Sequence, residues 1–105
     1  MTHAVERLDD VVHQRVRLGI LTILDELGEA DFNYLKTELG LTAGNLSRHL
    51  SVLGDADYIA VKKAIVDVRP RTWVRITKPG RAALKAELNI LRSLLGAHDD
   101  ARRRD

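Results

Sequence analysis

The chain has 105 residues, enough for one domain with one modest hydrophobic core, and aliphatic residues must form that core because aromatic residues make up only 4%. It has no cysteine, which excludes disulfides and thiolate metal sites, no segment apolar enough to span a bilayer, and no secretory pattern near its start. It also has no glycine-rich phosphate loop, zinc-protease motif or nucleophile beside a base, so we expect neither an enzyme nor a cofactor.

Positive charge is concentrated in the middle of the chain. Residues 42–81 hold eight basic and three acidic residues, a net charge of +5, whereas residues 1–41 have a net charge of −4. A basic island of this kind is typical of a phosphate-binding surface. The charge distribution, taken by itself, is explained equally well by basic residues that cluster by chance on a solvent-exposed face.

Helical periodicity marks the first half. Apolar residues recur at spacings of three and four from residue 5 to residue 27, which predicts a first helix with a break near its start. Asp31 is a candidate cap for a second helix that ends at Gly40, a residue that tolerates the left-handed conformation. Thr42 is a candidate cap for a third helix, whose inner face carries Leu46, Leu50 and Leu53.

The second half begins with strands. Tyr58–Val61 and Thr72–Ile76 are rich in β-branched and aromatic residues, which predicts an antiparallel hairpin with a long, basic tip. We expect Trp73 to pack inward. Thr77 is a candidate cap for a final helix with Pro79 in its first turn. We expect one domain over residues 1–96 and a flexible tail over residues 97–105, where apolar residues become rare.

The outward face of the third helix is short and polar. Such a face can enter the major groove of DNA, where arginine pairs with guanine and asparagine with adenine. Hydroxyl groups and the free backbone N–H groups at the helix start suit phosphate. His49 lies at the edge of the buried stripe, so it can either contact a phosphate or pack as a half-buried histidine. The candidate reading residues are Thr42, Gly44, Asn45, Ser47, Arg48, His49 and Ser51.

The hairpin carries a second group of candidate residues. Each lysine or arginine that reaches a phosphate releases counterions and strengthens binding without regard to sequence. The alternative is a solvated hairpin whose charges protect an edge strand from aggregation. The candidate phosphate contacts are Lys62, Lys63, Arg69, Arg71 and Thr72.

These segments together resemble a known family. LGLTAGNLSRHL (residues 39–50) is similar to the helix-turn-helix core of small ArsR-like and MarR-like regulators. HQRVRLGIL (13–21), PRT (70–72) and ITKPGR (76–81) are similar to the family's first helix, wing strand and start of the last helix. The resemblance implies a mainly α, winged helix-turn-helix fold with a three-helix core, a wing of two or three strands and a C-terminal dimerisation helix. It also implies a dimeric regulator that places its third helix in the major groove and its wing against the DNA backbone or in the minor groove.

Two positions depart from the family pattern. Asp57 stands where the family usually has glycine, although aspartate tolerates left-handed geometry better than most residues. The wing tip, residues 66–69, lacks the usual glycine, and Asp67 lies where phosphate is expected. The tip's contacts therefore remain open.

Apolar stripes at both ends predict a homodimer. A small core cannot cover them all, and an uncovered apolar patch usually marks an interface, with packing inside one monomer as the alternative. The expected dimer contacts are Val5, Leu8, Val12, Leu84, Leu88, Leu91 and Leu95.

The expected function is that of a cytoplasmic, nucleoid-associated repressor that binds an inverted-repeat operator in double-stranded DNA as a homodimer. The alternative is a winged-helix module that docks a protein and binds no DNA. We expect no metal site, because thiolate ligands are absent and the only other set is His98, Asp99 and Asp100 with His3 or His13 across a dimer. We expect no membrane partner, and the sequence does not define an effector.

Overall fold

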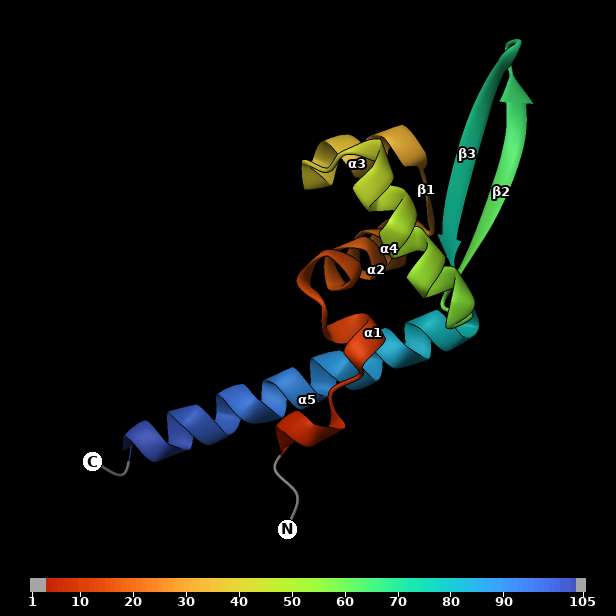
Figure 1. The fold of residues 1–105 in the computed structure, drawn as a ribbon. Helices are drawn as coiled ribbons and strands as arrows, with labels where there is room; N and C mark the ends of the chain where they lie inside the picture. Colours follow the sequence, from red (N-terminus) through yellow and green to blue (C-terminus); the bar gives the residue numbers. More distant parts are fainter. Residues whose placement is uncertain (1–3, 104–105) are drawn as a thin grey trace.

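The chain folds into a helical body from which a long β-hairpin rises on one side and a long helix extends on the other (Figure 1). The computed structural model describes residues 4–103. The elements in chain order are η1 (Ala4–Arg7), α1 (Asp10–His13), α2 (Arg15–Leu27), β1 (Glu29–Asp31), α3 (Phe32–Leu39), α4 (Ala43–Asp55), β2 (Ile59–Val66), β3 (Arg69–Ile76) and α5 (Lys78–Arg103). This is the predicted winged helix-turn-helix order, with β1 as an additional short strand.

The predicted first helix is broken into three pieces, and side-chain caps explain where. Asp9 Oδ1 accepts hydrogen bonds from the backbone N–H groups of Val11 and Val12, at 2.8 and 3.3 Å, and so starts α1. Gln14 has an extended backbone with ψ of 130°, which ends α1, and its Oε1 accepts from the N–H of Arg17 at 2.9 Å. Two side chains that satisfy free N–H groups therefore start two separate helices.

The turn between α3 and α4 has the predicted chemistry. Asp31 caps α3 through a 2.9 Å bond from the N–H of Asn33. Gly40 ends α3 with φ of 63°, and the N–H of Leu41 returns to the carbonyl of Lys36 at 2.9 Å. Thr42 Oγ1 accepts from the N–H of Asn45 at 3.1 Å and starts α4. These local bonds fix the angle between the two helices of the helix-turn-helix.

The three strands form an antiparallel sheet in the order β1-β3-β2. β1 pairs with β3 only from Trp73 to Arg75, whereas β2 and β3 pair along their whole length to Val66 and Arg69. The expected long tip is therefore wrong: it is a two-stranded ribbon closed by a two-residue turn. Pro70 fits within β3 because β2 is its only neighbouring strand there, and proline is tolerated at a free edge.

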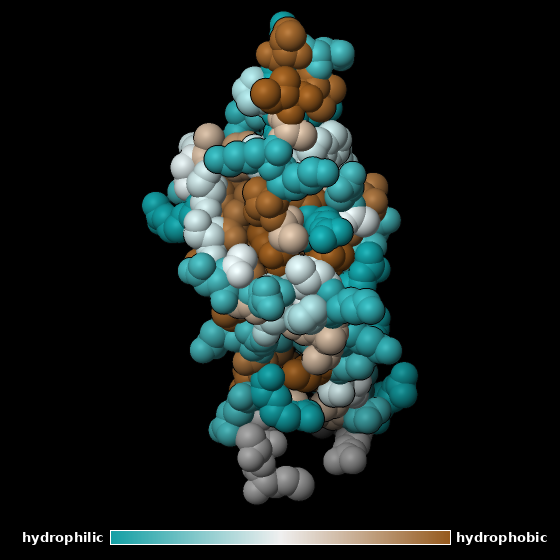
Figure 2. Space-filling view, turned by 90° about the vertical axis from the view of Figure 1, so that its right-hand side faces the viewer, coloured by the Kyte–Doolittle hydropathy of each residue, from teal (hydrophilic) through white to brown (hydrophobic). Residues whose placement is uncertain are grey.

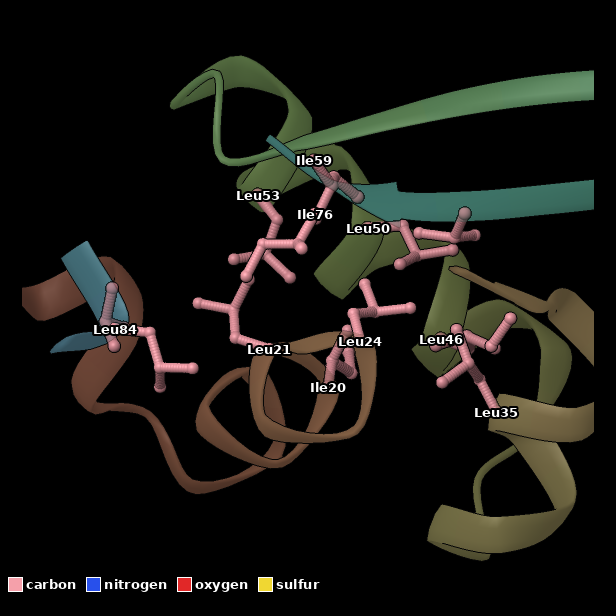
Figure 3. Packing of buried hydrophobic residues seen from close by; sticks show 13 residues of the cluster. Ile20, Leu21, Leu24, Leu35, Leu46, Leu50, Leu53, Ile59, Ile76 and Leu84 are labelled. Carbon is pink, nitrogen blue, oxygen red and sulfur yellow. The ribbon is translucent and has the colours of Figure 1, made fainter. Parts of the chain in front are cut away.

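The core lies where α2 and α4 pack against each other and against the sheet (Figure 3). Leu46 and Leu53 of α4 and Ile20, Leu21 and Leu24 of α2 have no exposed surface. The base of the hairpin closes this core through Ile59, Val74 and Ile76. Helix α4 is thus held by its apolar stripe, which leaves its polar face outward.

The helix α5 is longer than predicted. It runs to Arg103, so residues 97–103 are helical in the structure rather than an irregular tail. Ala97 and Ala101 favour helix, and the positive charges of Arg102 and Arg103 are favourable at the helix C-terminus. Residues 1–3 and 104–105 of the predicted domain and tail lie outside the described residues. Within residues 4–103, no helix is both long and apolar enough to cross a membrane.

Candidate nucleic-acid interface

The outward face of α4 carries the predicted reading residues together. Gly44, Asn45, Ser47, Arg48 and Ser51 are all exposed, whereas Leu46, Leu50 and Leu53 on the opposite side are buried. Thr42 is also exposed at the helix start. Its oxygen already caps the helix, so its hydroxyl hydrogen remains available to a phosphate oxygen. The structure therefore presents one polar helix face with a single cation, Arg48, near its centre.

His49 is half-buried and has a partner that the sequence did not suggest. Nη1 of Arg17 lies 3.3 Å from His49 Nδ1. A guanidinium group can only donate, so Nδ1 must accept, and the ring proton of a neutral His49 must sit on Nε2. Arg17 is itself fixed, because its Nε donates to the carbonyl of Val11 at 2.6 Å and its Nη2 to that of Asp10 at 3.2 Å.

The same surroundings favour the neutral form of His49. Partial burial lowers the pKa of the His49 ring below its usual value of 6.5, and the positive charges of Arg17 and Arg48 lower it further. A neutral ring with its proton on Nε2 is a hydrogen-bond donor at that atom. The Arg17 contact thus gives His49 a defined donor at the edge of the α4 face. No pattern in the sequence links residues 17 and 49.

The predicted wing residues divide between the two faces of the hairpin. In the register, Lys62 lies opposite Trp73, and Arg71 lies opposite Ala64, on the face that points away from the core. Lys63 and Thr72 are paired on the other face, in line with the buried residue Val74. Except for Thr72, which is half-buried, the predicted wing contacts are exposed. The wing is therefore basic on both faces.

Trp73 lies on the outer face of the sheet rather than in the core. It is half-buried, and the guanidinium carbon of Arg71 stands 5.7 Å from the centre of its ring. This cation–π distance is short enough for attraction between the arginine and the ring. The expectation of an inward Trp73 is wrong, because Val74 and Ile76 take the core face and alternation places Trp73 opposite to them.

A buried carboxylate ties the N-terminal segment to α5. Glu87 is only 1% exposed; its Oε1 accepts from the N–H of Asp9 at 3.1 Å, and its Oε2 lies 3.0 Å from Nδ1 of His13. Asp9 in turn accepts a 2.7 Å bond from the hydroxyl of Tyr58, just before β2. That bond, then burial and the charge of Asp9, raise the pKa of Tyr58. The network joins the start of the chain, α5 and the segment after α4.

Sequence reasoning missed both Glu87 and Arg17. Glu87 does leave a trace, since it stands between Leu84 and Leu88 on the apolar stripe of α5, where an acid needs a buried partner. Its partners are 74 and 78 residues away in sequence. No local pattern can reveal such a pair.

The turn after α4 forms with Asp57 at the position where the family usually has glycine. Asp57 has φ of 68°, as predicted for aspartate in a left-handed position, and its N–H donates to the carbonyl of Gly54 at 3.0 Å. Tyr58 N–H donates to the carbonyl of Leu53 at 3.0 Å. Helix α4 is thus connected to β2 by a closed turn.

The predicted dimer residues fall into two groups. Val12 and Leu84 are buried within the single chain, at 0% and 2% exposure, so their assignment to the dimer interface is corrected. Both join the core because α1 and α5 pack directly on each other. The others keep accessible surface: Leu8, Leu88 and Leu91 are half-buried, and Val5 and Leu95 are exposed.

The described residues bring no three metal-ligand side chains together. This statement covers His13, His98, Asp99 and Asp100 but not His3, which lies outside the described residues.

Comparisons with known proteins agree with this geometry. The family model of the winged helix DNA-binding domain matches residues 16–95. The chain is a winged-helix DNA-binding protein. MJ0432 of Methanocaldococcus jannaschii, an uncharacterized protein, is 43% identical over 70 residues, which span 67% of this chain and 76% of that one. The family is one of DNA-binding transcriptional regulators rather than enzymes.

Solved structures show the same fold. The transcriptional regulator homologue from Pyrococcus horikoshii OT3 has a TM-score of 0.88 and 32% identity, and the match covers 93% of this winged-helix chain and 99% of that chain. A MarR-family regulator from Enterococcus faecalis V583, at 17% identity, has a TM-score of 0.74 over 97% of this chain and 91% of that one. The predicted resemblance to small winged-helix regulators is thus confirmed.

Proposed function

We propose that this winged-helix protein is a sequence-specific repressor that binds an inverted-repeat operator as a homodimer, on the nucleoid in the cytoplasm. The observation that carries the proposal is the exposed polar face of α4 with the basic wing beside it. In this arrangement the N-terminal part of α4 and the far end of the hairpin lie on the side of the body away from α5 (Figure 1). One duplex can therefore touch both elements.

Arg48 and Asn45 are the proposed base-reading residues. Both are exposed on the first two turns of α4, and within residues 4–103 neither side chain is hydrogen-bonded to another protein group. Gly44 has no side chain and so adds no bulk beside them. The space where its Cβ would stand is open, with no other protein atom within 4 Å. Arginine and asparagine can each form two hydrogen bonds to one base edge, which supports a role in sequence discrimination.

The apolar surface of α5 and η1 supports a dimer. η1 packs on α5, and next to this contact Leu88 and Leu91 are half-buried while Leu95 is 64% exposed. A second copy would cover this patch. To bind an inverted repeat, such a dimer must present its two α4 helices about 34 Å apart, the spacing of successive major grooves on one face of a duplex.

Selection from a random duplex library tests the proposal. The native protein is expected to enrich an inverted repeat, and Arg48→Ala is expected to weaken binding to it by about 1–3 kcal/mol while relaxing preference at one base pair. Lys85→Ala on α5 removes the same charge away from α4, and it is expected to keep the preference. Equal loss by Arg48→Ala on selected and random duplexes contradicts base reading. Failure to enrich any duplex favours the protein-docking alternative.

A further inference from the structure

The end of the wing is apolar. The wing tip, residues 65–68, contains Ile65 at 79% exposure, Val66 at 41% and Val68 at 96%. Figure 2 shows hydrophobic side chains gathered at the top of the molecule, where the hairpin ends. These residues contribute nothing to the core, because the buried part of the hairpin is confined to its base. Exposed loops normally carry polar residues, so an apolar tip requires a reason.

The tip also retains a strained backbone. Asp67 has φ of 51° and Val68 has φ of 60°, the geometry of a two-residue hairpin turn in which asparagine and glycine are preferred. Val68 is the one β-branched residue with positive φ in the described part of the chain, and such a residue is disfavoured there. The chain thus gives up folding stability to hold an isopropyl group at the apex, which points to a function of that group.

The charged residues around the wing tip indicate which kind of molecule it contacts. Lys62, Lys63, Arg69 and Arg71 are exposed within a few residues of the apex, and Asp67 is the single acid among them. A basic ribbon favours a polyanion over an apolar protein groove. Pro70 has no N–H, so it gives no donor to an added strand, which argues against strand pairing with a second copy.

The ribbon has the reach that such a contact needs. Beyond the pair of Lys62 and Trp73, only β2 and β3 remain, and four more residue pairs extend to the turn. At about 3.3 Å per residue, the eight-residue strands carry the tip roughly 25 Å from the hairpin base. A duplex whose major groove holds α4 presents a minor groove on either side of that major groove.

We infer that Val68 and Ile65 form an apolar wedge that enters the minor groove and partly unstacks one base step, while the flanking cations hold the adjacent phosphates. This inference rests on the proposed DNA-binding function. Apolar side chains that enter the minor groove separate neighbouring bases and bend the duplex. Pyrimidine–purine steps such as TA deform most easily, so the wing should face one of them in the preferred site.

Val68→Gly tests the wedge with little risk to the fold. Glycine adopts φ of +60° without strain, so the variant is expected to have a higher thermal unfolding midpoint than the native protein. On the duplex that the native protein selects, it is expected to bind about tenfold more weakly, because it loses the burial of one apolar side chain. A variant that is more stable than the native protein but binds the duplex more weakly indicates that the Val68 side chain contacts DNA.

Two further measurements separate the wedge from the charges. With 2-aminopurine at the base step that faces the wing, the native protein is expected to raise fluorescence by unstacking, and Val68→Gly is expected to leave it low. The salt slope of Val68→Gly should equal that of the native protein, whereas the control Arg69→Gln should lower the slope by about one and keep the fluorescence change.

Native-like affinity and fluorescence in Val68→Gly overturn the wedge while leaving the proposed function intact. Absence of duplex binding by the native protein overturns both. Binding of the native protein to phosphatidylserine vesicles that is lost in Val68→Gly, together with unchanged duplex binding in that variant, assigns the tip to a lipid surface and also overturns the wedge.

Discussion

Gly80 holds α5 against the start of the wing, and replacing it tests how tightly these elements are packed. A Cβ at this position would clash with the carbonyl oxygen of Tyr58 and stand 3.0 Å from Cγ1 of Ile76. The Tyr58 carbonyl cannot simply retreat, because it accepts the N–H of Thr77 at 3.0 Å. Thr77 also caps α5 by accepting the N–H of Gly80 at 3.0 Å. Gly80→Ala must therefore shift backbone on one side or the other.

The expected cost follows from these contacts. Forcing a methyl group into a filled site costs about 1–3 kcal/mol, and loss of the bond between Thr77 and Tyr58 adds about 1 kcal/mol. The higher helix propensity of alanine offsets about 0.5–1 kcal/mol of this loss. The net effect is a loss of roughly 1–3 kcal/mol in the free energy of unfolding, which corresponds to a thermal midpoint lower by about 5–20 °C.

Urea unfolding followed by circular dichroism measures this loss, with native and variant proteins at one fixed concentration because a dimer's stability depends on it. Gly96→Ala is the matched control on the same helix, since nothing within the chain lies within 4 Å of its added Cβ. It is expected to gain up to about 1 kcal/mol. If Gly80→Ala is as stable as the native protein, the close packing of α5 on Tyr58 is refuted.

The remaining predictions concern charge, assembly and pH. Neutralising Lys62, Lys63, Arg69 or Arg71 one at a time should lower the slope of log affinity against log salt by about one each while site preference is retained; four unchanged slopes would exclude the wing from phosphate contact. Leu91→Glu, alone or with Leu88→Glu, should yield a monomer by light scattering with intact helical circular dichroism and weak operator binding; a native protein that is monomeric at micromolar concentration contradicts the dimer. The His49 ring should titrate below pH 6.5 by NMR, and Arg17→Gln should raise its pKa, because one of the causes that lower it is removed. Since the folded-state pKa is lowered, the stability that neutral His49 contributes is present above pH 6.5 and is lost as the pH falls through the lowered value. A midpoint at or above 6.5 in the native protein contradicts this environment.

The division of α4 into a buried and an exposed face could be predicted, because it depends on the short-range spacing of apolar residues. The stripe of Leu46, Leu50 and Leu53 defines which side of α4 faces outward, and the exposed side carries Arg48 and Asn45 as expected. The wing was predicted less well. Composition identifies its basic residues, but the predicted hairpin is too short, because Pro70 suggests that the strand breaks there. Proline fits within β3 only because β1 does not extend that far, and the sequence does not show where β1 ends.

Local structure can be predicted from the sequence: the helices, their caps at Asp31, Thr42 and Thr77, the left-handed turn at Gly40 and the concentration of positive charge. Each depends on side chains and backbone groups within about one helical turn, so a short stretch of sequence contains the whole interaction.

Only the packing of whole elements shows which apolar residues of α5 remain accessible and which charged groups pair in the interior. Val12 and Leu84 became core because α1 crosses α5, Glu87 became buried because Asp9 and His13 lie beside it, and His49 acquired its donor state from Arg17. These pairs are separated by 32 to 78 residues, and their contact depends on how whole elements pack. Periodicity and propensity carry no information about such distances, because they describe the neighbours of a residue along the chain rather than its neighbours in space.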